Sequence, residues 1–149
     1  MLGRLAASGT LRTSSSSFSA LLRGLRPRGR GISDVASAEE FQRLTAAGGP
    51  PTLAFYTAPW CGPCQEVAPH IDDISGRLEG RHLRILRIDV DAMHNLAREQ
   101  GIKAVPQFEV HREGHVVERL AGCGPEAVAE AAARHAADYA EMLKKKEER

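Results

Sequence analysis

Hydrophobic and polar positions follow two different periods along this chain. Apolar runs of five to eight residues, at 52–56 and 83–90, are typical of strands that are buried on both faces. Two further apolar segments, 107–111 and 116–121, flank the turn sequence Glu113-Gly114 and predict a β-hairpin. Stretches with helical spacing separate these segments, which predicts an α/β fold.

Four helices are expected between and after the strands. A capping-box pattern at residues 37–40 begins the first, and the Gly-Gly-Pro-Pro run at 48–51 ends it. The others are expected at 61–79, 92–100 and 124–144. The order is helix, strand, helix, strand, helix, strand, strand, helix. Parallel pairing through the helices and an antiparallel final hairpin predict a central mixed β-sheet flanked by helices on both faces.

Composition supports one folded domain. The chain has 149 residues and is 42% hydrophobic, which is enough for one core. Six of its 20 lysines and arginines lie in residues 1–33, so the remainder carries 14 basic and 19 acidic residues. This mildly acidic body argues against nucleic-acid binding, and no apolar run approaches the ~20 residues of a membrane span. Three cysteines are typical of a reducing compartment with one working pair.

The first 33 residues have the composition of an organellar transit peptide. They contain arginines, serines and no acid, and Phe18, Leu21, Leu22 and Leu25 would form one apolar stripe on a helix. The apolar run of a secretory signal is missing. We expect mitochondrial import to the matrix, with a plastid as the alternative, and cleavage near residues 28–33. The competing interpretation is a disordered basic tail that stays attached.

The expected domain organisation follows from these boundaries. Residues 1–33 form the transit peptide, 34–145 the folded domain, and 146–149 a charged C-terminal tail.

The candidate chemistry lies in the sequence Trp60-Cys61-Gly62-Pro63-Cys64. Two thiols separated by two residues can close a reversible disulfide with little backbone movement. A strand leads into this motif and a helix leaves it, so Cys61 is expected at a helix N-terminus, where the dipole favours a thiolate. A free cysteine with a pKa of about 8.5 is only ~3% ionised at pH 7, so this effect matters. We expect Cys61 to be the exposed nucleophile and Cys64, one turn further, to be the covered resolving thiol.

Several further motifs accompany the dithiol in a fixed order: Ala68-Pro69, Ile88-Asp89-Val90-Asp91, Gly101-Ile102, Val105-Pro106 and Gly122. Together with the dithiol they resemble the thioredoxin family over roughly residues 34–140. The resemblance implies the thioredoxin fold and a cis Val105-Pro106 bond that faces the disulfide. It also implies a low-relief surface on which protein disulfides dock, formed by Trp60, Gly62, Pro63, Val105, Pro106 and Gly122.

The chain departs from the family pattern near the dithiol. Phe55 stands where thioredoxins usually have a buried aspartate that helps to deprotonate the resolving thiol. Arg87 replaces the partner lysine, and it either stabilises a Cys64 thiolate or pairs with Asp89 two residues along the strand. Slow resolution of mixed disulfides is therefore expected. Gln107, where threonine is common, is interpreted as a tuning change.

The resemblance implies a protein-disulfide reductase that binds no cofactor and acts as a monomer. Its electrons would come from a thioredoxin reductase using NADPH and flavin, or from a glutathione or ferredoxin system, and peroxiredoxins are typical clients. Gly62-Pro63 favours a reductase over isomerases, which usually have a histidine in this dipeptide. The main alternative is a redox-sensing binding module with weak turnover, which Phe55 keeps open. A weaker one is an iron-sulfur cluster bridged by the Cys61 thiolates of two chains.

The remaining chemical candidates have simpler interpretations. Cys123 either fills a small-residue position or serves as a regulatory, oxidant-sensitive thiol. Four histidines match no zinc-site spacing and are expected to be solvated surface residues, so no metal site is predicted: His82, His94, His111 and His115. Asp91 is expected to begin the helix that follows it.

Overall fold

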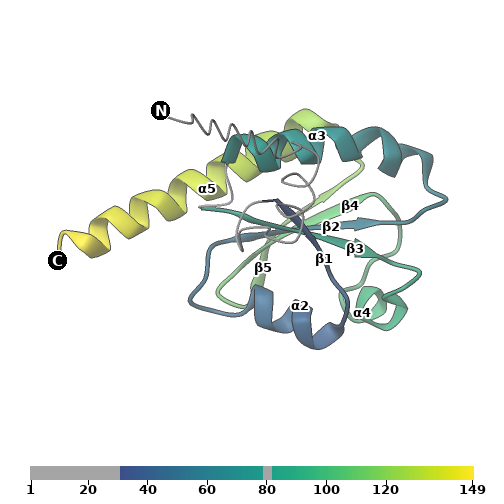
Figure 1. Cartoon of the computed structure of the whole chain (residues 1–149), viewed down its shortest axis with the longest axis horizontal. Helices are drawn as coiled ribbons and strands as arrows, with labels where there is room; N and C mark the ends of the chain where they lie inside the picture. The colour runs from purple at the N-terminus through teal and green to yellow at the C-terminus, as the bar shows by residue number, and fades with distance from the viewer. Residues whose placement is uncertain (1–30, 79–81) are drawn as a thin grey trace, which may run out of the picture.

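Five strands form one mixed sheet in the order β1-β3-β2-β4-β5 in the computed structural model, which describes residues 31–78 and 82–149 (Figure 1). The strands are β1 (Ile32–Asp34), β2 (Thr52–Thr57), β3 (Arg84–Asp89), β4 (Gln107–Arg112) and β5 (His115–Ala121). β1 and β2 run parallel to β3, whereas β4 is antiparallel to β2 and β5. The predicted mixed sheet is confirmed.

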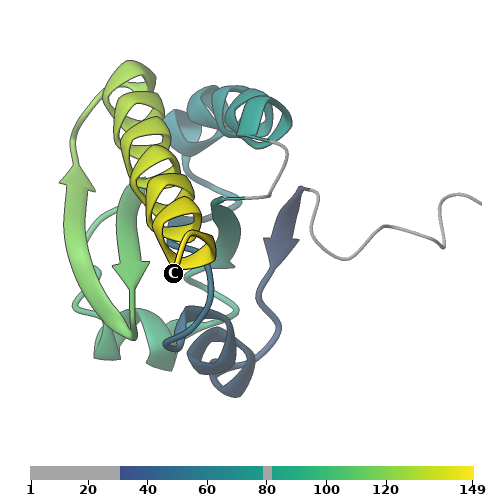
Figure 2. The ribbon, with the colours of Figure 1, turned by 90° about the vertical axis from the view of Figure 1, so that its left-hand side faces the viewer.

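Four helices cover the two faces of the sheet. They are α2 (Ala38–Thr45), α3 (Gly62–Leu78), α4 (His94–Glu99) and α5 (Pro125–Glu147). α3 and α5 pack on one face and α2 and α4 on the other, as both ribbon views show (Figures 1 and 2). We call these the α3/α5 face and the α2/α4 face. No helix in the described part of the chain is long and apolar enough to cross a membrane.

Strand β1 was not predicted. It pairs in parallel with β3, with Ile32 opposite Ile85 and Asp34 opposite Arg87. A three-residue strand has no periodicity of its own, and it forms here because the edge of β3 offers unpaired backbone groups. The folded part therefore includes Ile32 and Ser33, which lie ahead of the boundary expected at residue 34. Residues 1–30 of the expected transit peptide lie outside the described residues.

Two short sequence patterns form the structures that they predict, the start of α2 and the turn of the hairpin. The backbone N–H of Glu40 donates to Ser37 Oγ (3.1 Å), and the N–H of Ala36 donates to Glu40 Oε2 (2.8 Å), so the capping pattern begins α2 as expected. In the hairpin, Glu113 and Gly114 have φ values of 52° and 82°, the backbone of a tight two-residue turn.

The start of α4 and the end of α5 differ from the expectation. α4 begins at His94 rather than 92, because the side chain of Asp89 accepts from the N–H groups of Asp91 and Ala92 and holds a turn there. α5 continues to Glu147, and Lys145 pairs with Glu141 one turn earlier (2.8 Å). The expected end of α3 at residues 79–80 lies outside the described residues.

Candidate active site

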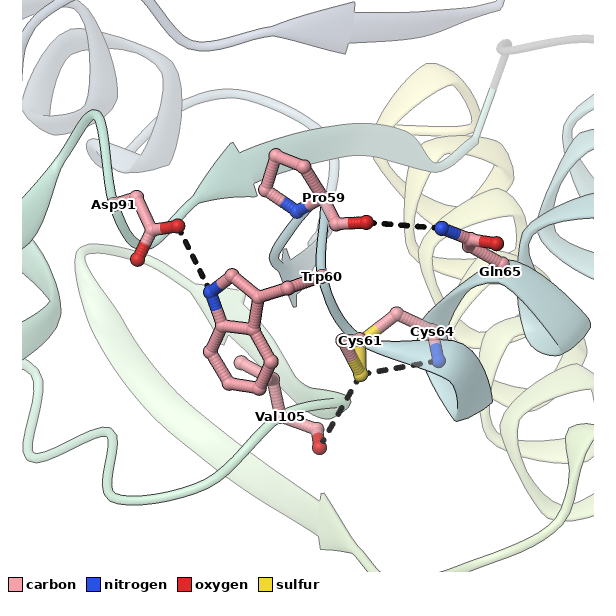
Figure 3. The surroundings of a disulfide bond; sticks show 7 residues. All are labelled: Pro59, Trp60, Cys61, Cys64, Gln65, Asp91 and Val105. Atoms are coloured by element: carbon pink, nitrogen blue, oxygen red, sulfur yellow. Dashed lines mark hydrogen bonds between the residues drawn. A yellow bond between two sulfur atoms is a disulfide. The ribbon is translucent and has the colours of Figure 1, made fainter.

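Strand β2 carries the dithiol to the end of the sheet. β2 is the central strand, paired on both sides, and a short loop after Thr57 leads to α3, which starts at Gly62. Cys61 and Cys64 form a disulfide with their Cα atoms 5.3 Å apart (Figure 3). The pairing that the spacing predicts is present.

The first turn of α3 places a backbone donor beside the sulfur of Cys61. The N–H of Cys64 lies 3.2 Å from Cys61 Sγ, at the open end of a 17-residue helix (Figure 3). The side-chain amide of Gln65 donates to the carbonyl of Pro59 (2.9 Å) and fixes the loop against the helix. Since unpaired N–H groups and the helix dipole favour negative charge, a thiolate at Cys61 is stabilised after reduction.

The two cysteines are both largely covered. Cys64 is 1% exposed, as expected, but Cys61 is only 4% exposed, so the expectation of an exposed Cys61 is wrong. Cys61 packs into the core of the α3/α5 face with Ala58, and its Sγ lies 3.7 Å from the carbonyl oxygen of Val105. Any molecule that reacts with this sulfur must therefore approach it closely.

The residues that the resemblance assigns to a docking surface are exposed or half-buried. Trp60 is 70% exposed, and Gly62, Pro63 and Gly122 are exposed. Val105 and Pro106 are half-buried, and the bond between them is cis, as the resemblance implied. Register brings the remaining glycine close, because Gln107 and Ala121 pair across β4 and β5, next to Pro106 and Gly122.

Trp60 is held by a contact that sequence reasoning missed. Its indole N–H donates to Asp91 Oδ2 (2.9 Å; Figure 3). Asp91 therefore orients the tryptophan and does not begin α4. The two residues lie 31 positions apart, and no sequence signal joins them.

Arg87 has a different partner from the one expected. Its Nε and Nη2 donate to the two carboxylate oxygens of Asp34, at 2.5 and 2.9 Å. The predicted pairing with Asp89 is wrong, because β1 lies beside β3 and places Asp34 opposite Arg87. The hydrogen bonds that Arg87 donates to Asp34 raise the pKa of Arg87 above its usual value. Asp89 instead accepts from the N–H groups of Asp91 (2.9 Å) and Ala92 (3.4 Å).

Phe55 occupies the position at which the family pattern has a buried aspartate. It is 1% exposed and stacks on Phe108 of β4, with ring centroids 4.9 Å apart. The side chain is thus part of the apolar core beside Cys64. Among the described residues, no buried carboxylate belongs to this core.

The opposite face holds a buried polar cluster that was also missed. Glu109 is 0% exposed, and the hydroxyl of Tyr56 donates to its Oε2 (3.1 Å). Burial and the neighbouring carboxylate raise the pKa of Tyr56. Nε2 of His111 lies 3.3 Å from the same oxygen, and Nε of Arg119 lies 3.4 Å from Oε1. His111 is buried, so the expectation of a solvated histidine is wrong there, because β4 turns that residue under Phe41 of α2.

The other candidates occupy less distinctive positions. Cys123 is a free thiol, half-buried against the core of the α3/α5 face. His94 and His115 are exposed, and His82 is half-buried. Within residues 31–78 and 82–149, no three His, Cys, Asp or Glu side chains are grouped to hold a metal ion.

Fold and site together define a thiol–disulfide oxidoreductase, with a cysteine pair at the start of a helix beside a cis-proline loop. The family profile described as Thioredoxin matches residues 33–134, and the chain belongs to that family. A thioredoxin of Coprinus comatus is 30% identical over 94 residues, which cover 63% of this chain and 88% of the relative.

Solved structures agree with this assignment. The thioredoxin of Malassezia sympodialis, Mala s 13, superposes with a TM-score of 0.64 at 28% identity, covering 75% of this chain and 96% of that one. A structure on thiol resolution in a yeast mitochondrial 1-Cys peroxiredoxin by glutathione and thioredoxin systems matches the fold, with a TM-score of 0.63 at 23% identity. That match covers 69% of this chain and 94% of the other.

Proposed function

We propose that this protein reduces disulfides of client proteins through its own dithiol. The Cys61 thiolate attacks a client disulfide, forming a mixed disulfide and releasing one client thiolate, which takes up a proton. Cys64 then loses its proton and attacks Cys61 Sγ. The Cys61–Cys64 disulfide forms, the Cys61–client bond breaks, and the second client sulfur is protonated. The observation that carries this proposal is the disulfide at the start of α3, with Cys64 covered beneath it.

The surrounding surface fits an extended client segment. Pro106 has no backbone N–H, and Val105 presents its carbonyl beside Cys61 Sγ at 3.7 Å. Trp60 supplies an exposed aromatic face held by Asp91. A client strand could pair with the Val105 backbone while its disulfide lies over Cys61.

Re-reduction requires an external donor. We propose that a thioredoxin reductase supplies the electrons from NADPH through flavin, with glutathione or ferredoxin systems as alternatives. Peroxiredoxins are proposed clients, supported by the fold-level match to the peroxiredoxin study. We further propose that the protein acts as a monomer.

Import into the mitochondrial matrix is proposed from the basic, acid-free composition of the N-terminal segment, with a plastid as the alternative. Since β1 begins at Ile32, cleavage before that residue would leave the whole strand in place. A fluorescent reporter fused to residues 1–31 tests the proposal by imaging. Diffuse fluorescence outside organelles would overturn it.

Turnover of insulin disulfides tests the main proposal. With dithiothreitol as electron donor, the protein should reduce many insulin molecules per chain, and the Cys61→Ser variant should reduce none. Cys123→Ser is the matched control, because that thiol is half-buried outside the pair. Binding of insulin in a one-to-one ratio without turnover would instead favour the redox-sensing module. The observation that supports this alternative is Phe55, which stands at the position of the usual acid.

Regulation through Cys123 remains a separate prediction. The thiol follows Gly122, near the cis-proline loop, and is partly accessible. Mild peroxide should modify it before it inactivates the dithiol. Mass spectrometry that finds only free Cys123 thiol after peroxide treatment would contradict this role.

A further inference from the structure

A cavity of about 300 Å³ lies beside the resolving thiol, on the α3/α5 face. Its lining includes Cys64 and Phe55 on the inner side and three charged residues, Asp34, Arg87 and Asp89. A single water needs only about 10–15 Å³, so the cavity can hold a chain of water molecules. Water can therefore connect the covered thiol to charged side chains.

Strand alternation places the three charged residues on one face. Arg87 and Asp89 are two positions apart on β3, so both point to the same side of the sheet as Phe55 and Thr57, their partners on β2. Asp34 lies opposite Arg87 on β1. Asp89 thus lies one strand away from position 55, and Asp34 lies two strands away. Position 55 itself is occupied by the stacked ring of Phe55.

The two carboxylates differ in how their oxygens are used. Both oxygens of Asp34 are hydrogen-bonded to Arg87, which stabilises the ionised form and makes this carboxylate a poor proton acceptor. Asp89 uses Oδ1 to accept two backbone N–H groups. Its Oδ2 makes no hydrogen bond with any described residue and is available to water.

We propose that Asp89 Oδ2 accepts the proton of Cys64, through water in this cavity, when Cys64 resolves a mixed disulfide. The proton leaves Cys64 Sγ, passes along the water to the carboxylate, and is later released to solvent. The thiolate attacks Cys61 as described above, so this inference rests on the proposed reductase function. Arg87, oriented by Asp34, is the positioning residue whose positive charge stabilises the thiolate.

The other charged groups near the cavity determine whether a thiolate at Cys64 is stabilised or destabilised. Asp72 of α3 adds negative charge near Arg87, and Cys61 is engaged in the mixed disulfide at that stage. Two carboxylates and one guanidinium line the cavity, so removing Arg87 leaves only negative charge, which disfavours a thiolate at Cys64. Arg87→Gln is therefore expected to slow resolution at neutral pH and to shift its pH profile upward.

Rapid mixing of the reduced full chain with 5,5′-dithiobis(2-nitrobenzoate) separates the steps. Attack by Cys61 releases one thionitrobenzoate in proportion to reagent concentration, and attack by Cys64 releases a second at a rate independent of it. A Cys123→Ser background removes the third thiol. We expect Asp89→Asn to slow the second phase about a hundredfold at pH 7, at the low end for loss of a general base. The first phase should be unchanged.

The choice of substitution and one matched variant control the interpretation. Asp89→Asn keeps a side-chain oxygen for the two N–H groups, so the turn before α4 is preserved. Asp73→Asn removes the same charge from α3, where Asp73 pairs with Arg77, and should leave both phases unchanged. Added formate should partly restore the second phase in Asp89→Asn, and the pH profile of that phase should differ from that of the unaltered protein.

The outcomes separate the two proposals. Equal second-phase rates and pH profiles in Asp89→Asn and Asp73→Asn would overturn the role of Asp89. Equal slowing of both phases in Asp89→Asn would do the same, because it indicates a structural effect. Failure of the otherwise unaltered protein to release a second thionitrobenzoate would instead contradict the reductase function itself.

Discussion

The two faces of the sheet differ in whether they bury polar side chains beside strands β2 and β4. On the α3/α5 face, next to the dithiol, Phe55 stacks on Phe108. One position along the same two strands, on the α2/α4 face, Tyr56 donates to the fully buried Glu109. Neighbouring residues of β2 and β4 thus form an apolar pair on one face and part of a buried polar cluster on the other.

The difference shows where this fold can hold an acid. Glu109 remains buried because Tyr56, His111 and Arg119 approach its two oxygens within 3.1–3.4 Å. Position 55 lies within the apolar core, and Arg87, the residue opposite it on β3, is already paired with Asp34. The acids beside Cys64 therefore lie along a cavity that water can enter, and Glu109 is separated from the dithiol by the sheet.

Placing an acid at position 55 is the strongest way to break this contrast. Phe55→Asp removes a stacked ring and buries a carboxylate in an apolar core whose neighbouring cation, Arg87, is already paired with Asp34. The free energy of unfolding should therefore fall by at least about 3–5 kcal/mol. Denaturant unfolding of the oxidised protein measures it, with Phe55→Leu as the control that loses less. If enough protein folds, the second thionitrobenzoate phase should become faster. An unchanged second phase would show that an acid at position 55 gives no benefit here.

Removing the acid from the other face tests whether the two faces are independent. Glu109→Ala leaves the Tyr56 hydroxyl and His111 without their partner and should lower the free energy of unfolding by about 3 kcal/mol. Glu109→Gln, which keeps acceptor and shape, should cost less. Insulin reduction per folded molecule should remain as in the unaltered protein. A fall in that rate at full folding would show that the faces are coupled through the sheet.

Glu118 of β5 sharpens the contrast, because it is a partly exposed acid on the α3/α5 face. Its contact with α5 depends on pH. Hydrogen bonds from Arg134 and His135 lower the pKa of Glu118 below its usual 4.5. A lowered folded-state pKa stabilises the protein above the unfolded value, and this contribution is lost as pH falls through the folded value. Glu118→Gln should therefore cost less than about 1 kcal/mol at pH 7. The free energies of unfolding of the two proteins should converge as pH falls through the lowered folded-state pKa of Glu118, and a constant difference would contradict the assignment.

The smallest effect is expected at the rim of the dithiol. Asp91→Ala removes the acceptor of the Trp60 indole, and because both side chains are exposed, stability should change by less than about 0.5 kcal/mol. Trp60 is the only tryptophan, so fluorescence reports on it directly and its emission should change. The KM for insulin should rise as the indole loses its orientation. Asp73→Asn serves as control, and identical emission in Asp91→Ala and the unaltered protein would contradict the contact.

Local patterns along the chain were enough to predict much of the fold and the centre of the site. The capping box, the two-residue hairpin turn and the central strands depend on residues close together in sequence, and each formed as predicted. The Cys61–Cys64 pair is equally local, because two intervening residues at a helix start hold the sulfurs together. Resemblance to the family added the cis Val105-Pro106 bond, which no local pattern indicates.

Contacts between distant segments could be decided only by the tertiary structure. β1 exists because β3 has a free edge, and that pairing turned Arg87 toward Asp34 and away from Asp89. The burial of His111, the small exposure of Cys61 and the bond from Trp60 to Asp91 depend in the same way on which elements pack together. The sequence by itself determined the reactive pair and the elements that carry it, since neighbouring residues are held together by the chain. Strand order and packing determined the charges and cavity around that pair, because they bring together residues that the chain leaves far apart.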